Sequence, residues 1–238
     1  MEPGDGLQQG LAGLRAHCYA EAFAERWRGV RGHPYEQGLD LRFWPGRLEL
    51  PLRWRKPKRI FVNSMSDLFH PDVPERFVAQ VWDTMARADW HTFQVLTKRP
   101  ERMPGLLREL GLQDPPLPNV WLGTSIENRR FVGRAEHLRR TPAAARFISA
   151  EPLLGPLRCP RRRWPDGYTG PSLCLTGIDW LIVGGESGPR HRPIDPRWVR
   201  DLPDACLCEF CRSDHQRRQD CPLCGEGSGS TRPRFFLA

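Results

Sequence analysis

The 238-residue sequence lacks any hydrophobic run long enough to cross a lipid bilayer. Its opening, Met1-Glu2-Pro3-Gly4-Asp5, also lacks the basic start and the apolar centre of a signal peptide. These absences exclude a membrane-spanning or secreted class and predict a cytoplasmic protein with no membrane partner. A chain of this length buries a full core, so we expect one main domain.

Acidic residues are the scarcer charged class. The 28 Asp and Glu are outnumbered by 36 Lys and Arg, which gives a net charge of +8 and a pI near 9.4. Such an excess favours polyanions, because their binding releases condensed counterions. A solvated, arginine-rich surface is the alternative interpretation. The charge therefore favours nucleic acid as a partner but does not establish it.

Cysteine is nearly absent from the first two thirds of the chain, where Cys18 stands alone. In a reducing compartment, the eight cysteines predict metal ligands or spare thiols rather than disulfides. Four of them have the paired spacing of a tetrahedral zinc site, and unpaired thiols are the alternative. These four are Cys208, Cys211, Cys221 and Cys224. No pairing pattern includes Cys159, Cys174 or Cys206, and Asp214 and His215 are expected to be loop residues.

Short apolar runs alternate with amphipathic segments along most of the chain. We expect strands at 59–62, 92–96, 119–123, 145–148, 178–183 and 232–237. We expect helices at 19–29, 75–88, 101–110, 130–140 and 196–202. Alternation of this kind predicts parallel strands covered by helices, hence an α/β fold. The segment 158–176 is rich in Pro, Arg and Gly and is expected to be a surface insert.

Polar or charged residues follow five of these predicted strands. They are Asp67, Lys98, Arg99, Glu127, Asn128, Glu151 and Glu186. Because the carboxyl ends of the strands of a βα barrel meet at one edge, we expect these residues to share a site. Ordinary helix capping is one alternative, and a salt-bridge network that closes the barrel mouth is another.

A basic stretch with an aromatic residue in it precedes the first of these strands. It reads Arg53-Trp54-Arg55-Lys56-Pro57-Lys58. Such a run is able to contact phosphate groups, and a solvated lead-in to a strand is the alternative.

Four long motifs carry a resemblance to a known family. They are Phe61-Val62-Asn63-Ser64-Met65-Ser66-Asp67-Leu68-Phe69-His70, Gln94-Val95-Leu96-Thr97-Lys98-Arg99-Pro100, Phe147-Ile148-Ser149-Ala150-Glu151-Pro152-Leu153-Leu154-Gly155 and Val183-Gly184-Gly185-Glu186-Ser187-Gly188-Pro189. Over about Cys18 to Leu202, the chain resembles the phage-associated Gp-thirty-seven/Gp-sixty-eight family, a domain of unknown function similar to radical SAM enzymes. The resemblance implies a partial or full βα barrel with a [4Fe–4S] cluster and S-adenosylmethionine.

The resemblance also locates the cluster loop. Family members open with Trp-Asn-Pro-Val-Thr-Gly-Cys, six residues, and then Cys-x-x-Cys-Tyr-Ala. Three thiolates then hold three irons and leave the fourth iron open for the cofactor. In this chain Cys18 and the following Tyr-Ala-Glu match the third ligand, but Arg15 stands at the second position and Gln8 at the first. The cluster site therefore has one ligand of three as written.

The late sequence Gly184-Gly185-Glu186 resembles a Gly-Gly-Glu motif that contacts the cofactor's amino group in radical SAM enzymes. In those enzymes the motif comes early in the barrel. Close packing or a turn is the alternative role for the two glycines.

Together with the resemblance, these features predict a radical SAM-like barrel over 1–205. Residues 1–17 are expected to be a remnant of the cluster loop that is translated in a shifted reading frame, as explained below. A Cys-rich zinc knuckle over 206–226 and a truncated last strand over 227–238 would follow. The predicted function is a phage-associated, radical SAM-like protein that acts on nucleic acid, inactive as written. A zinc-stabilised, basic nucleic-acid-binding protein and a cluster-free barrel hydrolase using Asp67, Glu127 and Glu151 are the alternatives.

The genetic code offers an explanation for the missing ligands. Read one base forward, the codons of residues 1–15 are able to spell the family's whole opening motif, with Cys available at Leu7 and Leu14. Each shifted codon reaches at most four residues, so an unbroken match of this length rarely arises by chance. We infer a frameshift near Ala16-His17, with Met1 as an out-of-frame start.

The gene sequence tests this inference. The shifted frame gives Cys where the codons of Leu7 and Leu14 end in G, so we expect CTG at both positions. The measurement is sequencing of the gene and its upstream DNA. Leucine codons with another last base, or an intact upstream frame without cysteine, would rule the frameshift out.

Overall fold

The computed structural model describes residues 19–62, 66–158, 172–188, 191–202 and 234–237. The chain divides into two compact units, one of Met1–Trp44 with Ser187–His191 and one of Pro45–Glu186 with Arg192–Ala238. Cys18, the predicted zinc knuckle at 206–226 and most of the predicted insert lie outside the described residues.

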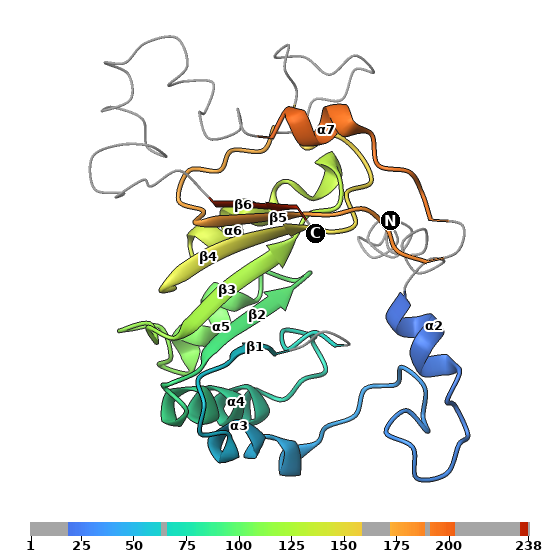
Figure 1. The fold of residues 1–238 in the computed structure, drawn as a ribbon. Helices are drawn as coiled ribbons and strands as arrows, with labels where there is room; N and C mark the ends of the chain where they lie inside the picture. Colours follow the sequence, from blue (N-terminus) through green and yellow to red (C-terminus); the bar gives the residue numbers. More distant parts are fainter. Residues whose placement is uncertain (1–18, 63–65, 159–171, 189–190, 203–233, 238) are drawn as a thin grey trace, which may run out of the picture. The chain divides into compact units, whose positions relative to one another are not determined.

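The second unit is built on one parallel sheet. Its strands are β1 (Arg59–Phe61), β2 (Thr92–Thr97), β3 (Val120–Ser125), β4 (Ala145–Ala150), β5 (Trp180–Val183) and β6 (Arg234–Leu237). They lie side by side in sequence order, and each pair is parallel (Figure 1). Sequential order distinguishes a barrel-type winding from a doubly wound sheet, in which the order reverses at a switch point. The predicted α/β class with parallel strands is confirmed.

Helical segments precede β1 and connect the later strands of this unit. They are η1 (Pro45–Arg47), α3 (Leu50–Arg53), α4 (Glu75–Arg87), α5 (Met103–Glu109), η2 (Arg129–Phe131), α6 (Arg134–Arg139) and α7 (Pro196–Arg200). The helix expected at 130–140 is two pieces, because a 3₁₀ turn capped by Asn128 runs to Phe131 and α6 starts only after Gly133. Within the described ranges, no helix combines the length and apolarity needed to cross a bilayer.

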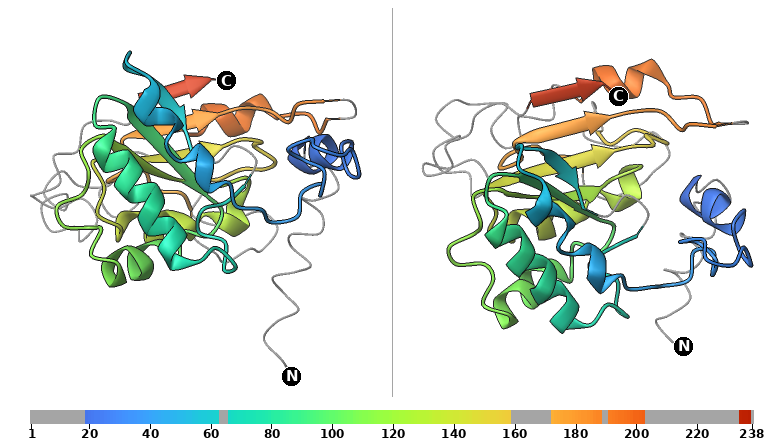
Figure 2. Two further views of the ribbon diagram at one scale, coloured as in Figure 1. Left: turned by 90° about the horizontal axis from the view of Figure 1, so that it is seen from below. Right: turned by 60° about the horizontal axis from the view of Figure 1, so that its bottom comes forward.

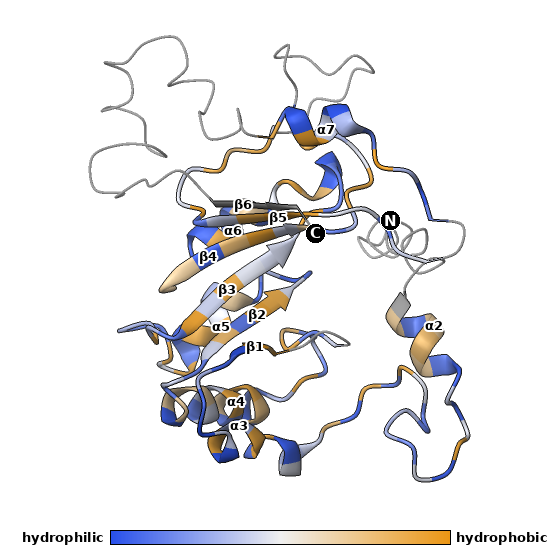
Figure 3. Cartoon of the chain, in the orientation of Figure 1, coloured by the Kyte–Doolittle hydropathy of each residue, from blue (hydrophilic) through white to orange (hydrophobic). Residues whose placement is uncertain are grey.

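Helix α4 shows why the sequence pattern predicted it. Val78, Val81, Trp82 and Met85 recur at helical spacing and are buried, whereas Phe77 is only half-buried. The helix accordingly carries both hydrophobic and hydrophilic residues along its length (Figure 3). Figure 2 shows α4 and α5 against one face of the sheet.

The two faces of β2 differ in burial. Alternate residues of β2, such as Phe93 and Val95, are buried, and the residues between them, Gln94 and Leu96, are half-exposed. On the half-exposed face, the Arg59 guanidinium carbon lies 5.8 Å from the ring centroids of both Trp121 and Trp180. These three residues belong to β1, β3 and β5, so the sheet curls far enough for alternate strands to meet, as in half of a barrel.

A close approach between β3 and β4 depends on glycine. The ring of Phe147 lies across Gly123, and a Cβ added to Gly123 would stand 2.4 Å from the ring. The two residues are neighbours in the β3–β4 register, and both are buried. The ring therefore occupies the space that any other residue at position 123 would need.

The first unit contains helix α2 (Tyr19–Glu25). Ala20 and Ala24 are buried, whereas Phe23 is exposed. The helix ends before the predicted residue 29, because Trp27 and Arg28 bond three residues back and Gly29 has a φ of +82°. The guanidinium of Arg28 hydrogen-bonds the carboxylate of Glu25, which lowers the pKa of Glu25 to about 2.

Replacing Gly123 tests the packing of the sheet. In Gly123→Ala, the methyl group meets the Phe147 ring, so we expect the free energy of unfolding to fall by about 1–3 kcal/mol. Gly105→Ala is the matched control, since nothing lies within 4 Å of its added Cβ and the residue is helical. The control should be neutral or more stable by up to about 1 kcal/mol. Urea denaturation measures both, and an equal effect of the two variants would contradict the packing described.

Candidate functional site

The carboxyl edge of the sheet carries a cluster centred on Asp67, which follows β1. Its carboxylate accepts hydrogen bonds from Oγ1 of Thr97 at 2.6 Å and from the Arg99 guanidinium at 2.9 Å. It also accepts the backbone N–H groups of Phe69 at 3.0 Å and Lys98 at 3.1 Å. Asp67 therefore ties the loop after β1 to the end of β2.

The second carboxylate of this edge, Glu127, follows β3 and is fully buried. Its Oε2 lies 3.1 Å from Nη1 of Arg134, which also donates to the carbonyl of Ser125 at 2.8 Å. Nζ of Lys98 lies 2.7 Å from Oε1, within ion-pair distance but not aligned as a hydrogen bond. The buried charge is compensated by one cation from α6 and one from the end of β2.

Arg134 was not singled out in the sequence. It lies in α6 and does not directly follow a strand in the sequence, only 13% of its side chain is exposed, and its guanidinium covers the Phe131 ring at 4.2 Å. Burial lowers the pKa of Arg134, and the Glu127 carboxylate opposes this effect. The sequence signal was an arginine seven residues after Glu127. Such spacings between acidic and basic residues are too common to predict an ion pair.

Asn128 has a local role. Its side-chain oxygen accepts the backbone N–H of Arg130 at 3.0 Å and caps η2. The capping alternative therefore describes this residue.

Glu151, which follows β4, is the exposed carboxylate of the edge. Among the described residues, no side chain donates a hydrogen bond to it or pairs with it. Its side chain lies against Gly184 at the end of β5, where an added Cβ would stand 2.7 Å from Cγ of Glu151. Gly184 thus leaves room for this carboxylate, which is the packing role considered for the glycine.

Glu186 is held by Arg192. Its Oε2 accepts the backbone N–H of Arg192 at 2.8 Å and the guanidinium Nε at 3.0 Å. The hydrogen bond to Glu186 raises the pKa of Arg192. This carboxylate is only 7% exposed, so it is less accessible to a ligand than Glu151.

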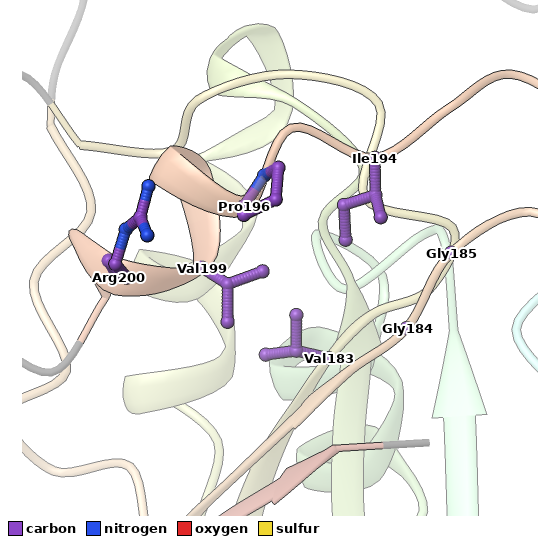
Figure 4. Close-up of a pocket in the computed structure, with 7 residues that line it drawn as sticks. All are labelled: Val183, Gly184, Gly185, Ile194, Pro196, Val199 and Arg200. Carbon is purple, nitrogen blue, oxygen red and sulfur yellow. The ribbon is translucent and has the colours of Figure 1, made fainter.

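An open pocket of about 360 Å³ lies between the end of β5 and α7. Figure 4 shows Val183, Ile194 and Val199 pointing into it and the Arg200 guanidinium pointing away from Val183. Of the predicted site residues, Gly184 and Gly185 line this pocket and the charged residues do not.

Metal ligands are not gathered in the part of the chain that the structure describes: no three His, Cys, Asp or Glu side chains are placed to hold an ion there. Cys174 is half-buried, with its thiol 3.3 Å from Oγ1 of Thr176. The predicted ligands Cys18, Cys208, Cys211, Cys221 and Cys224 lie outside the described residues.

The structure thus brings Asp67, Lys98, Arg99 and Glu127 together in one connected network and leaves Glu151 beside it, unpaired within the described ranges. The side chains of Lys98 and Arg99 remain 44% and 30% exposed. The edge therefore offers two accessible cations and one accessible carboxylate, a set that complements a zwitterionic or polyol ligand.

Removing the buried charge tests the network. Glu127→Gln leaves Arg134 buried without its counter-charge, so the free energy of unfolding should fall by about 3 kcal/mol or more. Glu136→Gln is the matched control, because Glu136 also pairs with two arginines, Arg139 and Arg140, but is itself 41% exposed. The control should cost less than about 1 kcal/mol. Urea denaturation, with a circular dichroism spectrum to confirm folding, measures the free energy of unfolding of both variants. A similar loss of stability in the two would contradict the buried ion pair between Glu127 and Arg134.

Comparison with known proteins places the chain in a family. A family model described as "Protein of unknown function (DUF5131)" matches residues 4–211, a range that contains β1 to β5 and the whole charged edge. No curated protein matches the chain. No solved structure matches it. The chain belongs to the DUF5131 family of proteins of unknown function.

Proposed function

We propose that this chain is a radical SAM-like barrel protein that binds S-adenosylmethionine at the carboxyl edge of its sheet. One observation carries the proposal: the exposed Lys98 and Glu151 and the half-exposed Arg99 lie at the carboxyl ends of β2 and β4, two alternate strands of a curled parallel sheet. In barrels of this kind, ligands bind where the loops after the strands converge.

The ligand's groups match the residues at this edge. Its methionine carboxylate suits Lys98 and Arg99, which present exposed donors although each already has an acidic partner. Its ribose hydroxyls and its ammonium group suit the exposed oxygens of Glu151. Gly184 leaves room for this carboxylate, because it has no side chain that would occupy the same space.

The iron–sulfur cluster implied by the resemblance does not fit the donor set of this chain. Three thiolates are needed, but Gln8 and Arg15 stand at two of the three positions, and neither side chain forms a thiolate. The chain as written therefore lacks the group that would cleave the cofactor, and we propose binding without turnover. A frameshift that hides both cysteines is our proposed origin of this state.

Nucleic acid is the proposed acceptor class, and a phage origin is part of the same proposal. The net charge of +8 supports a polyanionic partner. The hydrolase alternative is weaker, because Asp67 and Glu127 are both committed to cations and hydrogen-bond donors and are poorly placed to act as a general base. The ligands of the zinc-stabilised alternative lie outside the described residues.

Binding of S-adenosylmethionine to the purified chain tests the proposal. Lys98→Ala and Glu151→Gln should each weaken binding about tenfold, since each removes one charge-assisted contact. Glu109→Gln, an equal change in charge at the exposed end of α5, should leave binding unchanged. Isothermal titration calorimetry gives the dissociation constants. Absence of binding, or an equal loss in Glu109→Gln, would refute the site.

A further inference from the structure

A second charged surface lies away from the carboxyl edge, before β1. Five basic residues occupy positions 53–59, and all five are exposed. Arg53 pairs with Glu49 at 3.5 Å, but Arg55, Lys56 and Lys58 have no carboxylate partner among the described residues. Three neighbouring cations of this surface are thus exposed and have no carboxylate partner in the described part of the chain.

Aromatic side chains lie within this surface. Nζ of Lys58 lies 4.3 Å above the Trp54 ring, and Nε1 of Trp90 donates to the Trp54 carbonyl at 2.7 Å. Trp90 as a whole residue is nevertheless 38% exposed. We define Trp54, Arg55, Lys56, Lys58 and Trp90 as the basic–aromatic patch.

The buried His91 fixes the shape of this patch. Its Nδ1 accepts the backbone N–H of Lys58 at 3.0 Å, and its Nε2 lies 3.0 Å from the carbonyl of Pro51. One imidazole therefore joins α3, the loop before β1 and the start of β2. The backbone at Pro51 and Lys58, on either side of Arg55 and Lys56, is therefore fixed before any partner arrives, which lowers the entropic cost of binding.

From these contacts we infer that the basic–aromatic patch binds single-stranded nucleic acid. The three cations without carboxylate partners suit consecutive backbone phosphates. The exposed, hydrogen-bonded indole of Trp90 offers a face on which an unstacked base can lie, which a duplex does not provide. This inference rests on the proposed nucleic-acid partner, and it is independent of S-adenosylmethionine binding.

The test uses the full chain and a fluorescein-labelled single-stranded oligo-dT, with binding followed by anisotropy between 50 and 200 mM salt. The triple variant Arg55→Ala/Lys56→Ala/Lys58→Ala removes about three phosphate contacts, so the slope of log K against log salt should become shallower by about 2. Arg76→Ala/Arg108→Ala/Arg140→Ala makes the same change in net charge at exposed positions outside the patch and should leave most of the slope in place.

The outcomes separate the partner from its location. No binding by the unmodified chain would overturn both this inference and the nucleic-acid part of the proposed function, whatever calorimetry with S-adenosylmethionine shows. If the unmodified chain binds but the two triple variants have equal slopes, the basic–aromatic patch is not the binding site. The segment before β1 is then a solvated basic loop.

Substitution of Trp90 tests the stacking contact. Trp90→Ala should weaken binding about tenfold or more, whereas Trp90→Phe should keep most of the affinity. Both variants lose the hydrogen bond to Trp54, so their difference reports the ring alone. A duplex of the same length should bind more weakly than the single strand, and equal affinity for the two would overturn the role of Trp90.

Discussion

The carboxyl edge of this sheet depends on the compensation of one buried charge, that of Glu127. A carboxylate without exposure to water is tolerated only beside cations, and Lys98 and Arg134 provide them from β2's end and from α6. The same carboxylate therefore fixes how α6 meets the end of β3 and where Lys98 points. Asp67 continues the network to β1 through Thr97 and Arg99, so three strand ends are joined electrostatically.

Missing side chains at glycine are a second constraint. Gly123 accepts the Phe147 ring inside the sheet, and Gly184 accepts the Glu151 side chain at its edge. In both places the neighbour occupies the volume that a Cβ would need, so the position of the Phe147 ring and the position of the Glu151 carboxylate each depend on a missing Cβ. The proposed ligand site and the packing of β3 to β5 are therefore parts of one arrangement.

The grouping of Asp67, Lys98, Arg99 and Glu127 was predictable, because polar residues that follow parallel strands must meet at one edge. The salt bridges among them were only one of the alternatives to a shared ligand site, because sequence order does not say which cation reaches which carboxylate. Helix capping was the other. Arg134 was missed because its position on a helix carries no signal of the strand end it approaches. The roles of Asn128 and Glu186 are local, and they depend on hydrogen bonds that only coordinates reveal.

By itself, the sequence determined the alternation of strands and helices, the parallel sheet and the residues at its carboxyl edge, because hydrophobic periodicity and strand direction are local properties. The resemblance implied a partial or full βα barrel, but only the tertiary structure showed that the strands lie in sequence order and that their curl brings Arg59 to Trp121 and Trp180. Likewise, only folding separated Glu151 from the paired carboxylates, because burial and ion pairing depend on distances between segments that lie far apart along the chain.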